Sequence, residues 1–230
     1  MTRRGLVIAI DGPSGAGKST AGRTLAARLG YVFIDTGAMY RCVALKALRA
    51  QAPLDDDERL AALARDTRIE LLDGGQRVFL DGEHVTEEIR TRAVSVAASR
   101  VSAHPAVRRE LVARQREMGR EGGVVLDGRD IGTAVFPDAD VKFYFDADPG
   151  RRARRRQAEL DAAGPGADLP AIEAEIRERD RADATRTDSP LVRAADAVHL
   201  DTTELTPEQV VESMLATVRA KLDEDGQSSR

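Results

Sequence analysis

Residues 12–20 read GPSGAGKST and fit the pattern G-x-x-x-x-G-K-[ST]. An apolar run at residues 6–10 precedes this stretch, and a helical pattern from residue 18 to residue 29 follows it. A glycine-rich turn between a buried strand and a helix lets backbone N–H groups surround phosphate oxygens, with the positive end of the helix aimed at them. The context therefore predicts a nucleotide phosphate loop rather than an ordinary glycine turn.

Two side chains of this loop have distinct expected roles. Lys18 would neutralise charge on the β and γ phosphates, and the hydroxyl of Ser19 would bind Mg²⁺. The chain contains no Asn, so it cannot carry the N-K-x-D element on which guanine specificity in GTPases usually rests, and ATP is favoured. The residues expected to contact ATP here are Gly12, Pro13, Ser14, Gly15, Ala16, Gly17, Lys18, Ser19 and Thr20.

The rest of the chain alternates short apolar runs with helical patterns. We expect strands at residues 32–34, 124–126, 141–145 and 197–200, and helices at 38–50, from Pro149 onward, and from Pro207 to about Lys221. Such Val-, Ile- and Phe-rich runs are typical of parallel strands covered on both faces. The predicted fold class is therefore α/β, a P-loop-type parallel sheet flanked by helices.

One region interrupts this alternation. Residues 68–72 and 77–80 alternate with period two around Asp73-Gly74-Gly75, which predicts a β-hairpin in a small insertion. Further on, the breaker cluster at residues 164–167 (GPGA) separates two charged helical patterns and suits a mobile connection.

Composition excludes several classes of protein. The net charge of -4 over 230 residues argues against a polycation that coats nucleic acid. The apolar run at residues 6–10 is too short for a signal peptide or a membrane span. Cys42 is the single cysteine, so no internal disulfide can form, and we expect a cytoplasmic protein.

Arginine, rather than histidine, follows the predicted strands. The three histidines, His84, His104 and His199, form no base-like cluster. If the acceptor is itself a phosphate, two polyanions must meet, and arginine binds phosphate oxygens in bidentate fashion without losing its charge. No general base is needed, because a phosphate oxygen is already largely ionised near neutral pH. The pattern therefore indicates phosphoryl transfer to a phosphate.

Four segments resemble bacterial cytidylate kinases: residues 10–20 (IDGPSGAGKST), 34–41 (IDTGAMYR), 127–133 (DGRDIGT) and 179–186 (RDRADATR). Residues 88–92, 98–102 and 105–115 are also similar, and the resemblance extends from about residue 5 to residue 222. It implies a nucleoside monophosphate kinase that transfers the γ-phosphoryl group of MgATP to CMP or dCMP, acting as a monomer. Neither a membrane nor nucleic acid is an expected partner.

The resemblance also implies roles for individual residues. Those facing the acceptor phosphate and sugar would be Thr36, Tyr40, Arg41, Asp183 and Arg186. Those reading the cytosine ring would be Ser99, Arg108 and Asp130. Those acting at the transferring group would be Lys18, Asp127, Arg129 and Arg179.

Several of these residues have simpler interpretations. Asp127 ends a strand and either orients Mg²⁺ or caps the next turn. Thr36 could be part of an ordinary helix cap, and Arg179 could form an intrahelical ion pair with Asp183, four positions away. The cluster at residues 151–156 is either a charged helix face or a lid whose Arg152 and Arg156 approach ATP.

We expect one domain over residues 1–230. Its core would comprise residues 1–65, 91–150 and 187–222, with an insertion on the monophosphate side at about 66–90, a lid at about 151–186 and a frayed tail at 223–230. The alternative functions are a kinase for UMP, AMP or an acceptor such as shikimate, and a non-catalytic ATP-sensing module. A sensor needs no second anion site, so the many arginines argue against the module.

Overall fold

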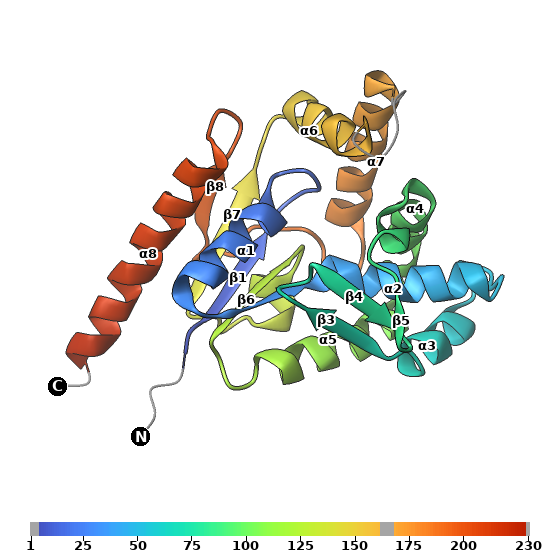
Figure 1. Ribbon diagram of the computed structural model, residues 1–230, viewed down its shortest axis with the longest axis horizontal. Helices are drawn as coiled ribbons and strands as arrows, with labels where there is room; N and C mark the ends of the chain where they lie inside the picture. Colours follow the sequence, from blue (N-terminus) through green and yellow to red (C-terminus); the bar gives the residue numbers. More distant parts are fainter. Residues whose placement is uncertain (1–4, 162–167, 229–230) are drawn as a thin grey trace. The chain divides into compact units, whose positions relative to one another are not determined.

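The computed structural model describes residues 5–161 and 168–228 (Figure 1). The predicted breaker cluster at residues 164–167 lies outside these ranges. The chain divides into two units, which are considered separately: the first covers residues 32–124 with Gly5, and the second covers residues 6–31 and the described residues from 125 onward.

The second unit is built on parallel strands. Its elements are β1 (Val7–Asp11), α1 (Lys18–Leu29), β6 (Val124–Gly128), the π-helix η2 (Ile131–Val135), β7 (Val141–Asp146), α6 (Pro149–Asp161), α7 (Leu169–Thr185), β8 (Val198–Asp201) and α8 (Pro207–Ser228). Four strands follow the order β6-β1-β7-β8, and β7 pairs in parallel with both β1 and β8. Every residue of β1 is buried, as a central strand requires. The predicted parallel sheet is confirmed.

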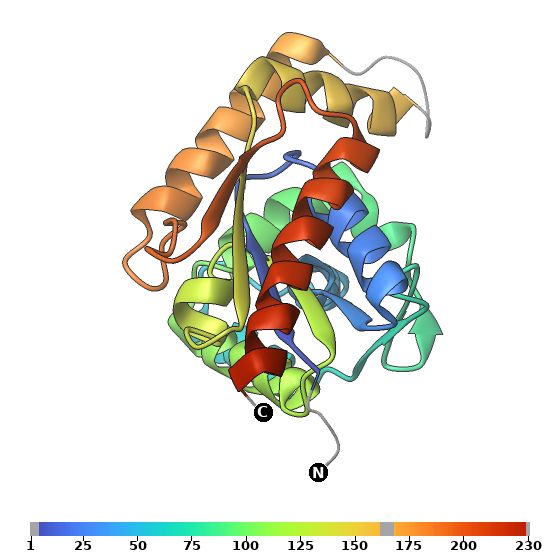
Figure 2. The same cartoon turned by 90° about the vertical axis from the view of Figure 1, so that its left-hand side faces the viewer.

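Helices α1 and α8 pack beside each other and against this sheet, as Figure 2 shows with α8 in red. Helix α1 ends at Leu29, as predicted, and Gly30 follows it in the left-handed conformation (φ 68°). A capping box begins α8, because the Thr206 amide donates to Gln209 Oε1 at 2.9 Å and the Gln209 amide donates to Thr206 Oγ1 at 3.2 Å. Helix α8 continues to Ser228, beyond the predicted end near Lys221.

Helices α6 and α7 pack against each other through a small apolar contact of their own. Ala153 of α6 and Ile172 and Ile176 of α7 form its buried part. Asp148 precedes Pro149 and accepts from the Arg151 amide at 3.0 Å, so the predicted helix start is confirmed.

The first unit combines helices with a small antiparallel sheet. Its elements are β2 (Val32–Asp35), α2 (Thr36–Arg49), α3 (Asp57–Arg65), β3 (Ile69–Leu72), β4 (Arg77–Leu80), β5 (Glu83–His84), η1 (Glu88–Arg90), α4 (Arg92–Val101) and α5 (Pro105–Gly119). Helix α2 packs against α3, α4 and α5. Their shared core includes the fully buried Met39, Leu60 and Leu111.

The predicted hairpin is confirmed as β3 and β4, to which the short β5 adds a third strand. Asp73, Gly74 and Gly75 all have positive φ at the turn. Helix α2 begins at Thr36, two residues before the predicted position, because the Asp35 carboxylate accepts from the Ala38 amide at 2.8 Å.

Cys42 lies on the apolar side of α2 and is fully buried. Burial raises the pKa of its thiol to about 12.

Within the described ranges, no helix is both long enough and apolar enough to cross a bilayer.

Candidate active site

The phosphate loop depends on glycine at three positions. Gly12, Gly15 and Gly17 have φ of 142°, 77° and 88°, which L side chains rarely adopt. A Cβ on Gly12 would lie 2.2 Å from the carbonyl oxygen of Phe145 in β7, and a Cβ on Gly15 would lie 3.1 Å from Arg152 Cβ. The loop can therefore pass this close to β7 and α6 only with glycine at these places.

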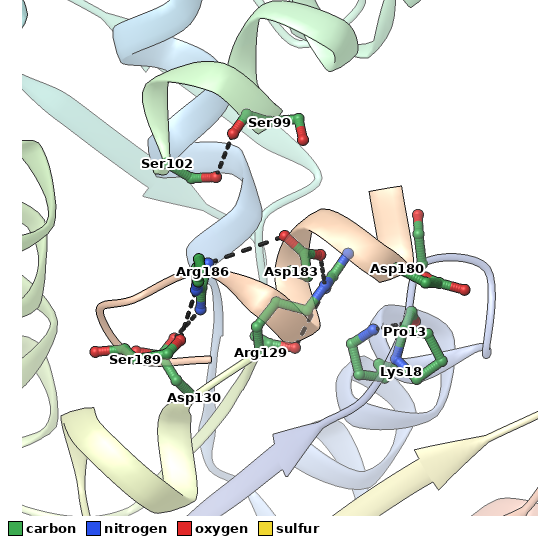
Figure 3. A network of polar contacts seen from close by, with 12 residues as sticks. Pro13, Lys18, Ser99, Ser102, Arg129, Asp130, Asp180, Asp183, Arg186 and Ser189 are labelled. Atoms are coloured by element: carbon green, nitrogen blue, oxygen red, sulfur yellow. Dashed lines mark hydrogen bonds and ion pairs between the residues drawn. The ribbon is translucent and has the colours of Figure 1, made fainter. Parts of the chain in front are cut away.

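Lys18 opens helix α1 with its side chain folded back over the loop. Its Nζ donates to the Pro13 carbonyl at 2.7 Å, and the residue is buried (Figure 3). The pKa of Lys18 lies well below its usual value because burial penalises the ammonium and Arg129 repels it, although Asp127 and Asp11 act in the opposite direction. Added negative charge at this place would favour the ammonium.

Ser19 is the next residue, and its hydroxyl donates to the Asp127 carboxylate at the end of β6. Asp127 is buried. A hydroxyl beside a carboxylate gives two oxygen donors of the kind that Mg²⁺ prefers. Across residues 5–161 and 168–228, no group of three or more His, Cys, Asp or Glu side chains could hold a metal ion. The final loop residue, Thr20, is exposed.

The segment after β6 and the end of α7 form one charged network, which Figure 3 shows. Arg129 Nε lies 2.8 Å from Asp183 Oδ2, and Arg186 lies 3.6 Å from Asp130 Oδ1 and 3.9 Å from Asp183 Oδ1. Burial would raise the pKa of Asp183, but Arg129, Arg179 and Arg186 outweigh it and lower that pKa. We call these four residues the Arg129 cluster: Arg129, Asp130, Asp183 and Arg186.

Two arginines of α6 and α7 approach the phosphate loop or this cluster. Arg152 is buried, pairs with Asp180 at 2.7 Å and donates to the carbonyls of Ala147 and Ser14 at 2.9 and 3.1 Å. Arg179 is close enough to affect two pKa values, lowering both that of Lys18 and that of Asp183. Arg156 instead pairs with Glu159 on its own helix at 2.8 Å.

The predicted acceptor residues of the first unit fall into two groups. At the start of α2, Arg41 lies 3.1 Å from Asp35 Oδ2. Thr36, the residue after Asp35, is buried. A Cβ on Gly37 would lie 3.2 Å from both Arg41 Nη1 and Asp35 Oδ1, so Gly37 allows the pair to form.

The second group joins α2, α4 and α5. The guanidinium of Arg108 lies over the Tyr40 ring, 5.7 Å from its centroid, and donates to the Ser102 carbonyl at 3.4 Å. The Ser102 hydroxyl in turn donates to the Ser99 carbonyl at 2.9 Å. In the first unit, Arg108 thus lies over Tyr40 and is connected through Ser102 to the backbone of Ser99.

Three acidic residues of the site were not predicted. Asp11 accepts from the amides of Ile131 and Gly132, Asp35 holds Arg41, and Asp180 holds Arg152. Asp11 and Asp35 each end a strand, the signal that was used for Asp127, so the same reasoning could have found them. Asp180 has no comparable signal, because its partner lies on another helix.

Comparison with known proteins agrees with this geometry. The sequence model of a family described as cytidylate kinase matches residues 8–220. The cytidylate kinase of Syntrophotalea carbinolica is 54% identical over 217 residues, covering 94% of this chain and 92% of the relative. That of Symbiobacterium thermophilum is 54% identical over 219 residues, covering 94% and 97%.

Among solved structures, a gluconokinase from Sinorhizobium meliloti 1021 has a similar fold, with a TM-score of 0.52 at 16% identity over 98% of this chain and 99% of that one. Sequence similarity to cytidylate kinases covers nearly the whole chain, including the phosphate loop, the Arg129 cluster and the start of α2. The chain therefore belongs to the cytidylate kinase family.

Proposed function

We propose that this protein transfers the γ-phosphoryl group of ATP to CMP or dCMP, giving ADP and CDP or dCDP. The observation that carries the proposal is the Arg129 cluster, in which two arginines, both largely shielded from solvent, lie with the buried carboxylates of Asp130 and Asp183. Two anionic nucleotides and a base that offers an amino group need this combination of charges. Membership of the cytidylate kinase family supports it independently.

The donor is held by the phosphate loop. Backbone N–H groups from Ser14 to Ser19 surround the phosphates, and Lys18 exchanges the Pro13 carbonyl for phosphate oxygens. Arg152 already fixes the Ser14 carbonyl, so we assign it to shaping the loop as well as to the ATP side, and Arg156 to the outer edge of that site.

Mg²⁺ would be held at Ser19 with Asp127 beside it, where it would offset phosphate charge during transfer.

Catalysis here consists mainly of positioning and electrostatic stabilisation. Arg129, Arg179 and Lys18 supply positive charge at the transferring phosphoryl group, whose charge spreads over its equatorial oxygens. Arg41, held by Asp35, binds the acceptor phosphate with Thr36 and Tyr40. The acceptor oxygen is already largely ionised, so no side chain has to remove a proton.

Acceptor choice rests on the base and the sugar. Cytosine presents an amino donor, and a carboxylate such as Asp130 accepts from it, as in groove recognition of cytosine. Uracil presents a carbonyl there, which cannot donate to Asp130 and would be repelled by its carboxylate. On the resemblance to the family, we assign Ser99 and Arg108 to the base as well, and Asp183 with Arg186 to the sugar.

Helices α6 and α7 form the proposed lid, which excludes water so that ATP is not hydrolysed. We also propose the division into core, insertion at about residues 66–90 and lid at about 151–186, and a cytoplasmic monomer. Light scattering of the purified protein tests the monomer.

The decisive experiment measures ADP release with MgATP and a panel of CMP, dCMP, UMP and AMP. We expect kcat/KM for CMP and dCMP to exceed that for the others by on the order of 10²-fold, the cost of losing one hydrogen bond to a buried carboxylate. A preference for UMP or AMP would show that the proposed acceptor is wrong. Tight ATP binding with no phosphorylated product would favour the sensing module.

A variant pair sharpens this test. Asp130→Ala should lower kcat/KM for CMP by about 10- to 100-fold while the affinity for ATP alone stays near the parental value. Asp138→Ala removes an exposed carboxylate after the same π-helix and should change neither. Equal losses of ATP and CMP binding in Asp130→Ala would contradict the base-reading role.

A further inference from the structure

The segment that carries Arg129 and Asp130 leads directly into the π-helix η2. The Asp130 carbonyl accepts from the amides of Ala134 and Val135 at 2.8 and 3.1 Å, and the Ile131 carbonyl accepts from the Phe136 amide at 2.7 Å. The first amides of such a helix have no acceptor within it. The direction of the preceding residues therefore depends on what those amides bind.

A single carboxylate binds the first two. Asp11 Oδ1 accepts from the Ile131 amide and Asp11 Oδ2 from the Gly132 amide, both at 2.7 Å. Asp11 is buried and is the last residue of β1, immediately before Gly12 of the phosphate loop. One side chain thus joins the start of the donor loop to the residues that directly follow Asp130.

Gly132 is also closely packed on its other side, against Lys142. A Cβ on Gly132 would lie 3.0 Å from Lys142 Cδ and 3.4 Å from Asp11 Oδ2. Lys142 of β7 is itself held, with Nζ 2.6 Å from the Pro137 carbonyl and 2.8 Å from Asp196 Oδ2. Gly132 is therefore confined between a carboxylate and a fixed aliphatic chain, and η2 can shift little along the sheet.

We propose that Asp11 is a positioning residue for acceptor binding and transfer. Its carboxylate fixes the backbone on which Arg129 and Asp130 stand, so their side chains are aligned with the phosphate loop before the acceptor arrives. Asp11 contacts neither nucleotide in this arrangement. The inference rests on the proposed function and extends it to a residue outside the acceptor-binding set.

The chemistry of the contact requires a carboxylate. Both bonds come from N–H donors, so the side chain must present two acceptor oxygens. Asparagine has the same shape but presents one NH₂ group, which would face an amide N–H and lose that bond. Asp11→Asn therefore changes the hydrogen bonding while it preserves the volume of the side chain.

The test compares Asp11→Asn with Asp140→Asn. Asp140 also accepts an amide of β1, from Val7 at 2.7 Å, but at the opposite end of the strand. For each variant we would measure kcat and KM for CMP at saturating ATP, the affinity for ATP without acceptor by calorimetry, and thermal unfolding. For Asp11→Asn we expect kcat/KM for CMP to fall by on the order of 10- to 100-fold, the effect of a misplaced binding group, with ATP affinity close to parental. Asp140→Asn should match the parent in both.

Two results would overturn the inference. One is parental kcat/KM for CMP in a folded Asp11→Asn protein, and the other is an equal loss of ATP and CMP binding, which would indicate general structural support. If Asp11→Asn does not fold, Asp11→Glu replaces it. That variant keeps the charge but moves the carboxylate outward by one carbon, and it must show the same selective loss for CMP or the inference fails.

The parent protein separates this inference from the proposed function. If the parent fails to phosphorylate CMP, the proposed function is wrong. If the parent phosphorylates CMP and Asp11→Asn does so equally well, only the positioning role is wrong.

Discussion

Two charged clusters of this protein are both built from arginines and carboxylates but differ in burial. The Arg129 cluster is nearly inaccessible, since the side chains of Asp130, Asp183 and Arg186 are 7–8% exposed and that of Arg129 is 18% exposed. The second, here called the Arg49 cluster, lies on the first unit, is 37–59% exposed and consists of Arg49, Glu83 and Glu88.

The exposed cluster has the better ion-pair geometry. Arg49 binds Glu83 with two bonds of 2.7 and 2.8 Å, whereas two of the three ion pairs of the Arg129 cluster exceed 3.5 Å. Burying charges costs free energy that such long pairs recover poorly, while the exposed pairs gain little because water screens them. Burial combined with imperfect pairing therefore distinguishes a binding site from a surface salt bridge.

The largest effect should come from replacing a buried lysine, and a lysine at the protein surface serves as its control. Lys18→Ala should lower turnover on the order of 10³-fold or more, because the transferring phosphoryl group loses its nearest charge. Lys46, which pairs with Asp81 at 2.7 Å at the protein surface, is the matched control, and Lys46→Ala should keep parental turnover. Steady-state kinetics with CMP measures both, and near-normal turnover in Lys18→Ala would remove the basis of the donor site.

Arginine in the buried cluster should come next. Arg129→Ala should lower kcat/KM for CMP by about 10²- to 10³-fold. Arg129→Lys keeps the charge but not the planar fork, so it should recover only part of that loss. Full recovery in Arg129→Lys would mean that charge alone matters here. Thermal unfolding is needed alongside, because truncation leaves Asp183 buried without this partner.

Stability should change with pH in opposite directions for two carboxyl groups, that of Asp11 and that of Glu83 in the Arg49 cluster. Burial raises the pKa of Asp11 from 3.8 to about 6 and Asp130 adds to the rise, against its two amide bonds and Lys18. The folded state then binds more protons than the unfolded state between these pH values. The contribution of Asp11 to the free energy of unfolding is fully present below about pH 4 and is lost as the pH rises through about 6.

The loss amounts to at most about 3 kcal/mol, at about 1.4 kcal/mol per pKa unit. Urea unfolding from pH 4 to pH 7 should show it in the parent and not in Asp11→Asn. Arg49 lowers the pKa of Glu83, so Glu83 contributes stability that is lost as pH falls. A parent-minus-variant difference that does not change between pH 4 and pH 6 would contradict the assigned burial of Asp11.

The smallest effect belongs to the exposed cluster. Arg49→Ala should cost about 1 kcal/mol or less of unfolding free energy, and salt should diminish the difference. Turnover with CMP should not change. A loss of several kcal/mol, or a loss of activity, would show that good ion-pair geometry at the surface matters more than burial.

The elements that could be predicted from the sequence are those with local causes. The phosphate loop, the end of α1 at Gly30, the starts of α6 and α8 and the β3–β4 hairpin all follow from residues a few positions apart. The π-helix η2 could not be predicted, because Asp11, which binds its first amides, lies 120 positions away from Ile131. No local pattern encodes such a contact.

The site residues also divide into those that local sequence predicts and those that it does not. Lys18 and Ser19 could be assigned from the chemistry of the loop, whereas roles for Ser99, Arg108 and Asp183 came from resemblance to a family. The structure adds why Asp183 is not a simple i,i+4 partner of Arg179: its carboxylate lies 2.8 Å from Arg129 on another element. Residue spacing along one helix cannot predict an ion pair between two different elements.

The burial of Cys42 makes this protein convenient to label. A thiol with a pKa of about 12 has almost no thiolate at neutral pH, and the thiolate is the form that reacts with maleimides. Dyes would therefore attach to cysteines introduced at exposed positions, such as Arg59→Cys in the first unit and Ser213→Cys in the second. Each dye would then report on its own unit during turnover, with the native cysteine left in place.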